Sequence, residues 1–368
     1  MSQSKQLFPL QLENNRVWRT YSGGLYLEQW QGVENAEDSS FPEEWIASTV
    51  QARNVGREGI QEGLSLVVAE GQPPTTLKDC IESDPSRYLG TQHTSIYGSQ
   101  TAVLVKALDA GERLTIQVHP DRQFAKQVFQ SDFGKTEAWL VIGGREIDGE
   151  APYVLLGFKP GITKAFWKEV FEKQDIPAML DCLHRVPVEA GDIFLVEGGV
   201  PHAIGSGCFL IEIQEPTDYT LRVERTTPKG NIVPDMACHI GIGFDRMLDA
   251  FHYESMTLIE MLNKWKKLPR LLSQTEGGRR FSLISDTDTD RFTMERIEVE
   301  GSLQTSGTGT FIIAIILSGA GIMTYKDKTF QINQSNQWFI PAEVSEMIWE
   351  RTSHNRLDVI LCFPPHKP

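Results

Sequence analysis

The chain has 368 residues, 40% of them hydrophobic and 23% charged, a composition that is ordinary for a globular protein and excludes a disordered or fibrous one. This length is large for one compact core, so we expect two or more packed units. The formal net charge of −14, without any basic stripe, argues against a nucleic-acid partner but leaves a small anionic ligand open.

Cysteine usage and the apolar segments bear on where the protein works. The five cysteines are widely spaced and form no C-x-x-C pair, so we expect buried thiols in a reducing compartment and no thiolate metal cage. Residues 1–5 lack the apolar core of a secretory signal. The longest apolar run, residues 311–317, is far shorter than a membrane span and predicts a buried strand. By elimination we expect a cytoplasmic protein without a membrane partner.

Short strands separated by turns dominate the first 245 residues. The first is expected at 17–21, and a short helix is expected at 76–81, directly after Pro73 and Pro74. Asp121 is expected to cap a helix over 122–129, and apolar residues at helical spacing predict a helical insertion over about 162–184. Further strands are expected at 103–106, 114–119, 137–142, 192–196 and 209–213.

The rest of the chain divides into a connector and a second β-unit. Met247, Leu248 and Phe251 have helical spacing, which predicts a helical connector over 245–278. Strands then recur at 281–284, 292–297, 311–317 and 338–340. We therefore expect a mainly β protein with two jelly-roll-like sandwiches, an N-terminal domain over 1–244 and a C-terminal domain over 279–368.

Three short segments carry polar residues in patterns that suit metal chemistry. Thr115, Gln117 and His119 share one face of the strand at 114–119, although a solvated face explains this spacing equally well. Lys135 and Glu137 also share a face, which an exposed ion pair would explain. A single histidine follows a Gly-Gly bend at residues 198–202, where a satisfied core histidine is the alternative. Their combination supplies the oxygen and nitrogen donors that divalent metals prefer.

The order of these residues resembles the cupin superfamily. Residues 111–119, read as Gly-x5-Gln-x-His with Glu137 downstream, are similar to the first cupin motif with glutamine in place of its first histidine. Residues 191–202, read as Gly-x5-Glu-x-Gly-x2-His, are similar to the second motif with glutamate in place of proline. The C-terminal unit has cupin-like turns at 319–321 and 340–342 but no such ligands, so we expect a cupin-like sandwich without metal.

Within the cupins, the chain resembles type I mannose-6-phosphate isomerases over roughly residues 15–245. The segments that carry this resemblance are Gln-x-His-Pro-Asp, Gly-Lys-Thr-Glu, Pro-His-Ala and the pair Glu212-x9-Arg222. The resemblance implies one zinc ion per chain, and it places the metal ligands at Gln117, His119, Glu137 and His202. It places the residues near the substrate at Thr115, Lys135, Glu212, Asp218 and Arg222.

The implied reaction interconverts mannose 6-phosphate and fructose 6-phosphate through an enediol. Such a reaction needs a base and positive charge beside the developing enediolate oxygen. We expect Arg222, Lys135 and Glu212 to be catalytic, with Glu212 as the base and Asp218 or a metal-bound hydroxide as rivals. Thr115, Lys135 and Asp218 are expected to bind the sugar phosphate.

Two alternatives share the same metal site. The first is isomerisation of another sugar or sugar phosphate, because Thr115 stands where serine is common in the family and residues 215–217 also depart from its pattern. The second is a cupin that binds a sugar without turning it over, against which the presence of both Lys135 and Arg222 argues. Iron, manganese or cobalt could replace zinc in such a site. Either a monomer or a homodimer is compatible with the sequence.

Overall fold

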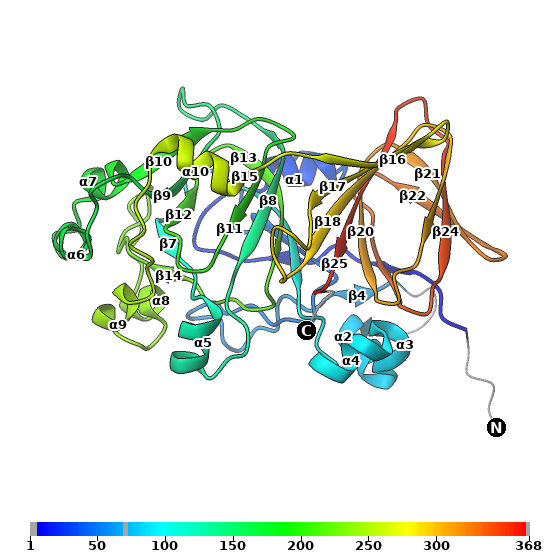
Figure 1. Ribbon diagram of the computed structural model, residues 1–368, viewed down its shortest axis with the longest axis horizontal. Helices are drawn as coiled ribbons and strands as arrows, with labels where there is room; N and C mark the ends of the chain where they lie inside the picture. Colours follow the sequence, from blue (N-terminus) through cyan, green and yellow to red (C-terminus); the bar gives the residue numbers. More distant parts are fainter. Residues whose placement is uncertain (1–5, 69–72, 366–368) are drawn as a thin grey trace.

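The structure is a computed structural model that describes residues 6–68 and 73–365, so the expectation about residues 1–5 lies outside it. Within these residues, strands outnumber helices and assemble into four antiparallel sheets. Figure 1 shows two β-sandwiches side by side, the cyan and green one carrying helices on its outer side and the orange and red one forming the other end. The predicted mainly β fold with two sandwiches is therefore confirmed.

The N-terminal sandwich pairs a five-stranded sheet with a seven-stranded sheet. The five-stranded sheet runs in the order β10 (Leu183–Pro187), β9 (Tyr153–Phe158), β12 (His202–Ile204), β7 (Gln117–Val118) and β14 (Leu221–Arg222). The seven-stranded sheet runs in the order β15 (Lys266–Lys267), β11 (Ile193–Val196), β8 (Glu137–Gly144), β13 (Cys208–Gln214), β6 (Leu104–Asp109), β3 (Glu43–Ile46) and β2 (Arg16–Val17).

The C-terminal sandwich pairs a nine-stranded sheet with a four-stranded sheet. The nine-stranded sheet runs in the order β16 (Arg270–Thr275), β17 (Gly278–Ile284), β18 (Thr293–Val299), β25 (Leu357–Phe363), β20 (Ile312–Ser318), β23 (Gln337–Ile340), β1 (Leu10–Leu12), β4 (Leu66–Val67) and β5 (Thr75–Thr76). The four-stranded sheet runs in the order β19 (Ser302–Ser306), β24 (Glu346–Arg351), β21 (Ala320–Tyr325) and β22 (Lys328–Asn333).

The boundary expected at residue 244 does not separate the two sandwiches completely. Strand β1 pairs with β23, so that Leu10 lies opposite Phe339, and β4 and β5 extend the same sheet. Three strands from the first 80 residues therefore belong to the C-terminal sandwich. A strand edge is stabilised by any partner that supplies backbone hydrogen bonds, and sequence distance does not restrict that choice.

The apolar clusters show how the sheets stack. One core lies between the seven-stranded and nine-stranded sheets, where Ile211 and Ile213 of β13 share a cluster with Ile313 and Ile360 of the C-terminal sandwich. The opposite face of β13 contributes Leu210 to the interior of the N-terminal sandwich. Because successive side chains of a strand point to opposite faces, β13 is apolar on both. The C-terminal sandwich thus covers the outer face of the sheet that carries part of the site.

Helices cover the ends and outer faces of these sheets, and α6, α7 and α9 pack on the outer face of the five-stranded sheet. The helices are α1 (Leu25–Trp30), α2 (Leu77–Ser83), α3 (Pro85–Leu89), α4 (Thr91–Tyr97), α5 (Arg122–Phe129), α6 (Lys164–Glu172), α7 (Ile176–Asp181), α8 (Asp235–His239), α9 (Phe244–Leu248) and α10 (Leu258–Trp265). Asp121 caps α5 as expected, because its carboxylate accepts a hydrogen bond from the backbone N–H of Phe124. In the described residues, no helix is long and apolar enough to cross a membrane.

Three expected elements differ from the structure. The connector is helical only as far as Trp265; Pro269 disfavours further helix, and β16 instead forms a hairpin with β17. The strand expected at 114–119 is regular only at 117–118, because the Glu224 carboxylate accepts the N–H of Ile116. The strand expected at 17–21 ends at Val17.

Candidate active site

Strand register places three candidate residues in one row of the five-stranded sheet. His202 of β12 lies directly opposite Gln117 of β7, and Arg222 of β14 lies opposite Gln117 on its other side. Residues directly opposite in neighbouring strands point to the same face. The row His202–Gln117–Arg222 therefore faces into the N-terminal sandwich as one surface.

The seven-stranded sheet contributes a second row. Glu212 of β13 lies opposite Trp139 of β8 and opposite Lys106 of β6. Glu137 is two residues before Trp139, so the period of two puts it on the same face. Trp139 also donates a hydrogen bond to Glu137 from its indole nitrogen, at 3.1 Å. The charged residues of this sheet thus meet the row of the facing sheet.

His119, Glu137 and His202 form a compact cluster of metal-binding groups. Their candidate ligand atoms all lie within 4.8 Å of one another. His119 Nε2 is 3.2 Å from Glu137 Oε2, and His202 Nε2 is 3.4 Å from Glu137 Oε1. All three side chains are at most 1% exposed. Among the residues that the structure describes, this is the one group of three or more His, Cys, Asp or Glu side chains with such geometry.

The hydrogen bonds of the two imidazoles fix which nitrogen is free. His119 Nδ1 lies 2.8 Å from the carbonyl oxygen of Tyr219, and His202 Nδ1 lies 2.9 Å from that of Val200. A carbonyl oxygen can only accept, so each Nδ1 donates and carries the proton. Each Nε2 therefore keeps its lone pair and points it toward Glu137. Backbone partners of this kind orient histidine ligands in metal sites.

Gln117 and Lys135 complete the surroundings of the cluster. The Gln117 amide nitrogen is 3.2 Å from His202 Nε2, and a half-turn of the amide would present its oxygen instead. The Lys135 ammonium lies 2.7 Å from His119 Nε2 and 2.5 Å from Glu137 Oε2. Lys135 and Glu137 are buried, so the exposed ion pair considered as the alternative is excluded.

Burial sets the protonation of the cluster. It lowers the pKa of His119 to about 4, with the charge of Lys135 contributing, and it also lowers the pKa of His202. Burial alone would raise the pKa of Glu137, but the Lys135 ammonium and the two histidines outweigh it and hold that pKa well below its usual range. At neutral pH the cluster offers two neutral nitrogen donors and one carboxylate. This donor set fits a divalent metal ion, and the neighbouring Gln117 amide can offer an oxygen to the same position.

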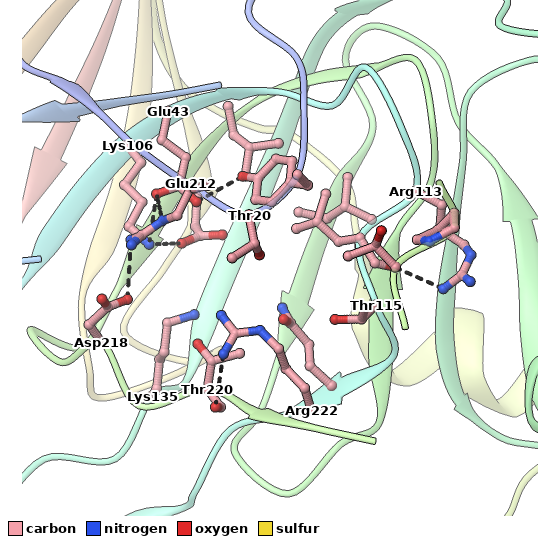
Figure 2. A pocket seen from close by; sticks show the side chains of 18 residues that line it. Thr20, Glu43, Lys106, Arg113, Thr115, Lys135, Glu212, Asp218, Thr220 and Arg222 are labelled. Carbon is pink, nitrogen blue, oxygen red and sulfur yellow. Dashed lines mark hydrogen bonds and ion pairs between the residues drawn. The ribbon is translucent and has the colours of Figure 1, made fainter. Parts of the chain in front are cut away.

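A polar pocket adjoins the cluster and contains the expected substrate residues. Thr115, Lys135, Glu212, Asp218 and Arg222 all line it. Figure 2 shows Glu43, Lys106 and Glu212 at the upper left, with Asp218, Lys135, Thr220 and Arg222 below them. His119, Glu137 and His202 are not among the residues that line the pocket. Gln117 and Lys135 line it and also contact the cluster.

A chain of alternating charges in this pocket was missed in the sequence. It begins at Glu212, passes through Lys106, Glu43 and Arg19, and ends at Asp218, with successive separations of 3.3, 3.8, 3.0 and 3.3 Å. Burial lowers the pKa of Lys106, but Glu212 and Glu43 raise it by more, so the ammonium stays charged. A single lysine within an apolar strand was the signal that could have revealed Lys106. Arg19 and Glu43 gave no comparable signal, because Arg19 lies just after the two-residue strand β2 and Glu43 begins the four-residue strand β3, too short for a pattern to stand out.

Arg222 and Thr115 occupy the other side of the pocket. Arg222 donates a hydrogen bond of 2.8 Å to the carbonyl oxygen of Ala237 in α8, which fixes its guanidinium against the pocket. Arg113, beside Thr115, is held in a two-pronged ion pair with Glu224 at 2.5 and 2.8 Å. Glu224 also binds the N–H of Ile116, so this pair anchors the segment that leads to Gln117.

Comparison with known proteins shows which family this chain resembles. The sequence model of a family described as "Phosphomannose isomerase type I, catalytic domain" matches residues 61–136, a range that contains Gln117, His119 and Lys135. A mannose-6-phosphate isomerase from Streptococcus mutans serotype c is 26% identical over 270 residues, which are 71% of this chain and 76% of that protein. Mannose-6-phosphate isomerase ManA from Bacillus subtilis is 34% identical over 126 residues, which are 34% of this chain and 38% of that protein.

Solved structures agree in fold over almost the whole chain. The mannose 6-phosphate isomerase from Bacillus subtilis superposes with a TM-score of 0.75 at 20% identity, covering 97% of this chain and 99% of that one. A mutant phosphomannose isomerase from Salmonella typhimurium gives a TM-score of 0.71 at 14% identity, covering 97% of this chain and 99% of that one. Together with the buried His119–Glu137–His202 cluster, these matches show that the chain is similar to type I phosphomannose isomerases, in sequence over about 71% of its length and in fold over 97% of it.

Proposed function

We propose that this protein is a metal-dependent isomerase that interconverts mannose 6-phosphate and fructose 6-phosphate. The observation that carries the proposal is the convergence of His119, Glu137 and His202 beside a pocket lined by Lys106, Lys135 and Arg222. Five cationic side chains against three carboxylates around one small pocket, in a chain of net charge −14, suit an anionic substrate and an anionic intermediate.

Gln117, His119, Glu137 and His202 would hold the metal, for which we propose zinc. A divalent ion bound there would act as a Lewis acid that polarises the C1 and C2 oxygens of the sugar. The two Nδ1–H donors to backbone carbonyls keep both imidazoles oriented for that task. Lys135 lies against the ligands rather than far from them, so its positive charge acts at the reacting end of the sugar.

Glu212 is the proposed base for proton transfer between C2 and C1. Its Oε1 lies 3.3 Å from the Lys106 ammonium and accepts no hydrogen bond from any group in residues 6–68 and 73–365. The rival Asp218 is more fully engaged, because one oxygen pairs with Arg19 and the other accepts the N–H of Arg53 at 3.0 Å. An oxygen that is not already accepting a hydrogen bond is better placed to take a proton.

Binding of the rest of the substrate falls to the hydroxyl and charged groups around the pocket. Thr115 supplies a hydroxyl on the side away from Glu212, and Asp218 and Arg222 supply further polar contacts to the sugar phosphate. Binding energy from a remote phosphate aligns the reacting carbons with the base. A cytoplasmic location fits a phosphorylated substrate and five cysteines that are all free.

The reaction is tested by supplying mannose 6-phosphate and measuring fructose 6-phosphate with a coupled dehydrogenase. We expect turnover that stops after chelation and returns when zinc is restored. Turnover of a different sugar phosphate, with none of mannose 6-phosphate, would support the second isomerase hypothesis. Sugar binding without any turnover in the zinc-loaded protein would support the non-catalytic alternative.

A further inference from the structure

His252 lies outside both metal-binding motifs, in the segment between α9 and α10, and yet contacts the backbone that carries two of the proposed ligands. Its Nε2 lies 2.8 Å from Oδ2 of Asp121, and a carboxylate can only accept, so the imidazole donates. Its backbone N–H donates to the carbonyl oxygen of Gly199, also at 2.8 Å. Asp121 follows His119 by two residues, and Gly199 precedes His202 by three.

A further backbone hydrogen bond closes these contacts into a ring. The N–H of Gly199 donates to the carbonyl oxygen of His119 at 2.7 Å. The ring therefore passes from His119 to Gly199, from Gly199 to His252, and from His252 to Asp121, which rejoins His119 through the chain. The second oxygen of Asp121 binds the N–H of Phe124 and so fixes this carboxylate to the first turn of α5. His252 is the one member of the ring that neither ligand-bearing segment contributes.

Packing at Gly199 shows how closely His252 fits the second motif. Gly199 has φ of +90°, and a Cβ built there would come within 2.5 Å of the His252 ring. Only glycine satisfies both the backbone angle and this contact. The imidazole therefore lies directly on the turn that leads to His202.

The turns also have hydrogen bonds from within the site, since Gly198 N–H donates to Thr136 Oγ1 at 3.2 Å and Lys135 N–H donates to the Pro120 carbonyl oxygen at 2.9 Å, but His252 holds them from outside it. Asp121, Gly198, His252 and Pro201 line a hollow of about 430 Å³ beside the junction, so solvent rather than packed side chains borders it. The His252 side chain itself is 50% exposed. A bound metal tolerates only small errors in ligand position, and ligands on turns rely on hydrogen bonds from outside the cluster to hold them.

We propose that His252 is a positioning residue that holds the segments of His119 and His202 in register for metal binding. The inference rests on the metal site of the proposed function, since it assigns His252 to the support of that site. His252 touches neither the sugar nor the ligand atoms; it acts through Asp121 and Gly199.

The test measures zinc affinity of the full chain by competition with a chromophoric chelator, without substrate. We expect His252→Ala to weaken zinc binding by about tenfold, at the lower end of the effect of outer hydrogen-bond partners in metal sites. His252→Gln keeps a donor at similar reach and should restore most of the affinity. Asp121→Asn keeps an oxygen for the α5 cap but replaces the acceptor, so its effect should not add to that of His252→Ala. His354→Ala, at an exposed histidine between β24 and β25, is the matched control.

Two results would overturn the proposal. One is a zinc affinity of His252→Ala equal to that of wild type. The other is that His252→Ala and His252→Gln lose equal amounts of melting temperature in the metal-free state and do not differ in zinc affinity. That result would show that His252 supports the fold in general and not the metal site. Failure of the proposed function would appear separately, as wild-type protein that binds no zinc or turns over no mannose 6-phosphate.

Discussion

The two sandwiches share an architecture but fill their interiors differently. In the N-terminal sandwich, one end of the space between the sheets holds His202, Gln117 and Arg222 facing Glu212 and Lys106. In the C-terminal sandwich, the corresponding space is filled by apolar side chains from both sheets, including Ile316, Met323 and Trp349. The same fold therefore supports a charged site in one copy and an uninterrupted apolar core in the other.

The difference shows what a buried polar site requires. The buried charges of the chain from Glu212 to Asp218 alternate in sign, so that each has a partner of opposite sign. Such pairs contribute little net stability, because desolvation offsets most of their attraction. Apolar burial must supply the stability instead, and the core between the seven-stranded and nine-stranded sheets does so on the outer face of the site's own sheet. The C-terminal sandwich thus stabilises, from its outer face, the sheet that carries part of the site.

Removal of a metal ligand should have the largest effect and should leave the C-terminal sandwich intact. Glu137→Ala is expected to abolish zinc binding and to lower kcat/KM by about ten-thousand-fold, since a metal supplies several kcal/mol of transition-state stabilisation. Metal content and turnover are the measurements. Glu350→Ala, at an exposed carboxylate on β24, is the matched control and should change neither. Full activity of Glu137→Ala with its metal retained would show that the ligand assignment is wrong.

The stabilising role of the C-terminal sandwich is tested by truncating a side chain that lies between the two sandwiches. Ile313→Ala should lower the free energy of unfolding by about 3 kcal/mol, measured by chemical denaturation, and leave kcat within about twofold. Ile316→Ala removes a similar side chain from within the C-terminal sandwich and should cost about as much. A drop in kcat of more than tenfold for Ile313→Ala alone would mean that packing between the two sandwiches also determines the geometry of the site.

A cation of the pocket is expected to contribute less than the metal. Lys106→Met should lower kcat by about hundredfold, the typical effect of losing one donor near developing negative charge, while zinc content stays at the wild-type level. Lys328→Met, at an exposed lysine of β22, controls for loss of a positive charge from the chain. Loss of zinc together with kcat would place the role of Lys106 in the metal site instead.

Acid should destabilise the metal-free N-terminal sandwich through its buried histidines. The pKa of His119 is about 4 in the folded protein, below the usual 6.5, so the unfolded chain takes up the proton first as pH falls. Stability is therefore lost between about pH 6.5 and pH 4, amounting to about 2 kcal/mol from His119 between pH 7 and pH 5. Denaturation of chelated wild type and His119→Asn at both values isolates this contribution. Equal pH dependence of the two proteins would contradict it.

The C-terminal sandwich contacts one buried histidine among the described residues, His93 of α4, whose ring packs edge-on against Phe311 and whose pKa is lowered by burial. Its one described histidine after residue 279, His354, is exposed. The comparison is sharpened if denaturation is followed by separate probes in the two sandwiches, because the N-terminal probe reports on two buried histidines with lowered pKa, His119 and His202, and should shift more with acid. A common shift would show that the apolar interface makes them unfold together.

The sequence determined the class of the fold and most residues of the site. Strands that alternate or run apolar, such as those of β8, β13 and β20, were placed correctly because local side-chain patterning follows the geometry of a sheet. The ligand set came from the family resemblance of two short motifs, and the structure brings His119, Glu137 and His202 within 4.8 Å. The order of residues along the chain was therefore enough to single out the His119–Glu137–His202 cluster.

Tertiary structure alone decided the rest. Glu43 and Lys106 join the pocket through pairing of β3, β6 and β13, and Arg19, two residues after β2, through pairing of β2 with β3. Asp121 meets His252 across 131 residues. The addition of β1, β4 and β5 to the C-terminal sheet is likewise invisible in the sequence. These contacts depend on which backbone edges and charges meet in space, a choice made by the free energy of the whole assembled fold and not by any short segment.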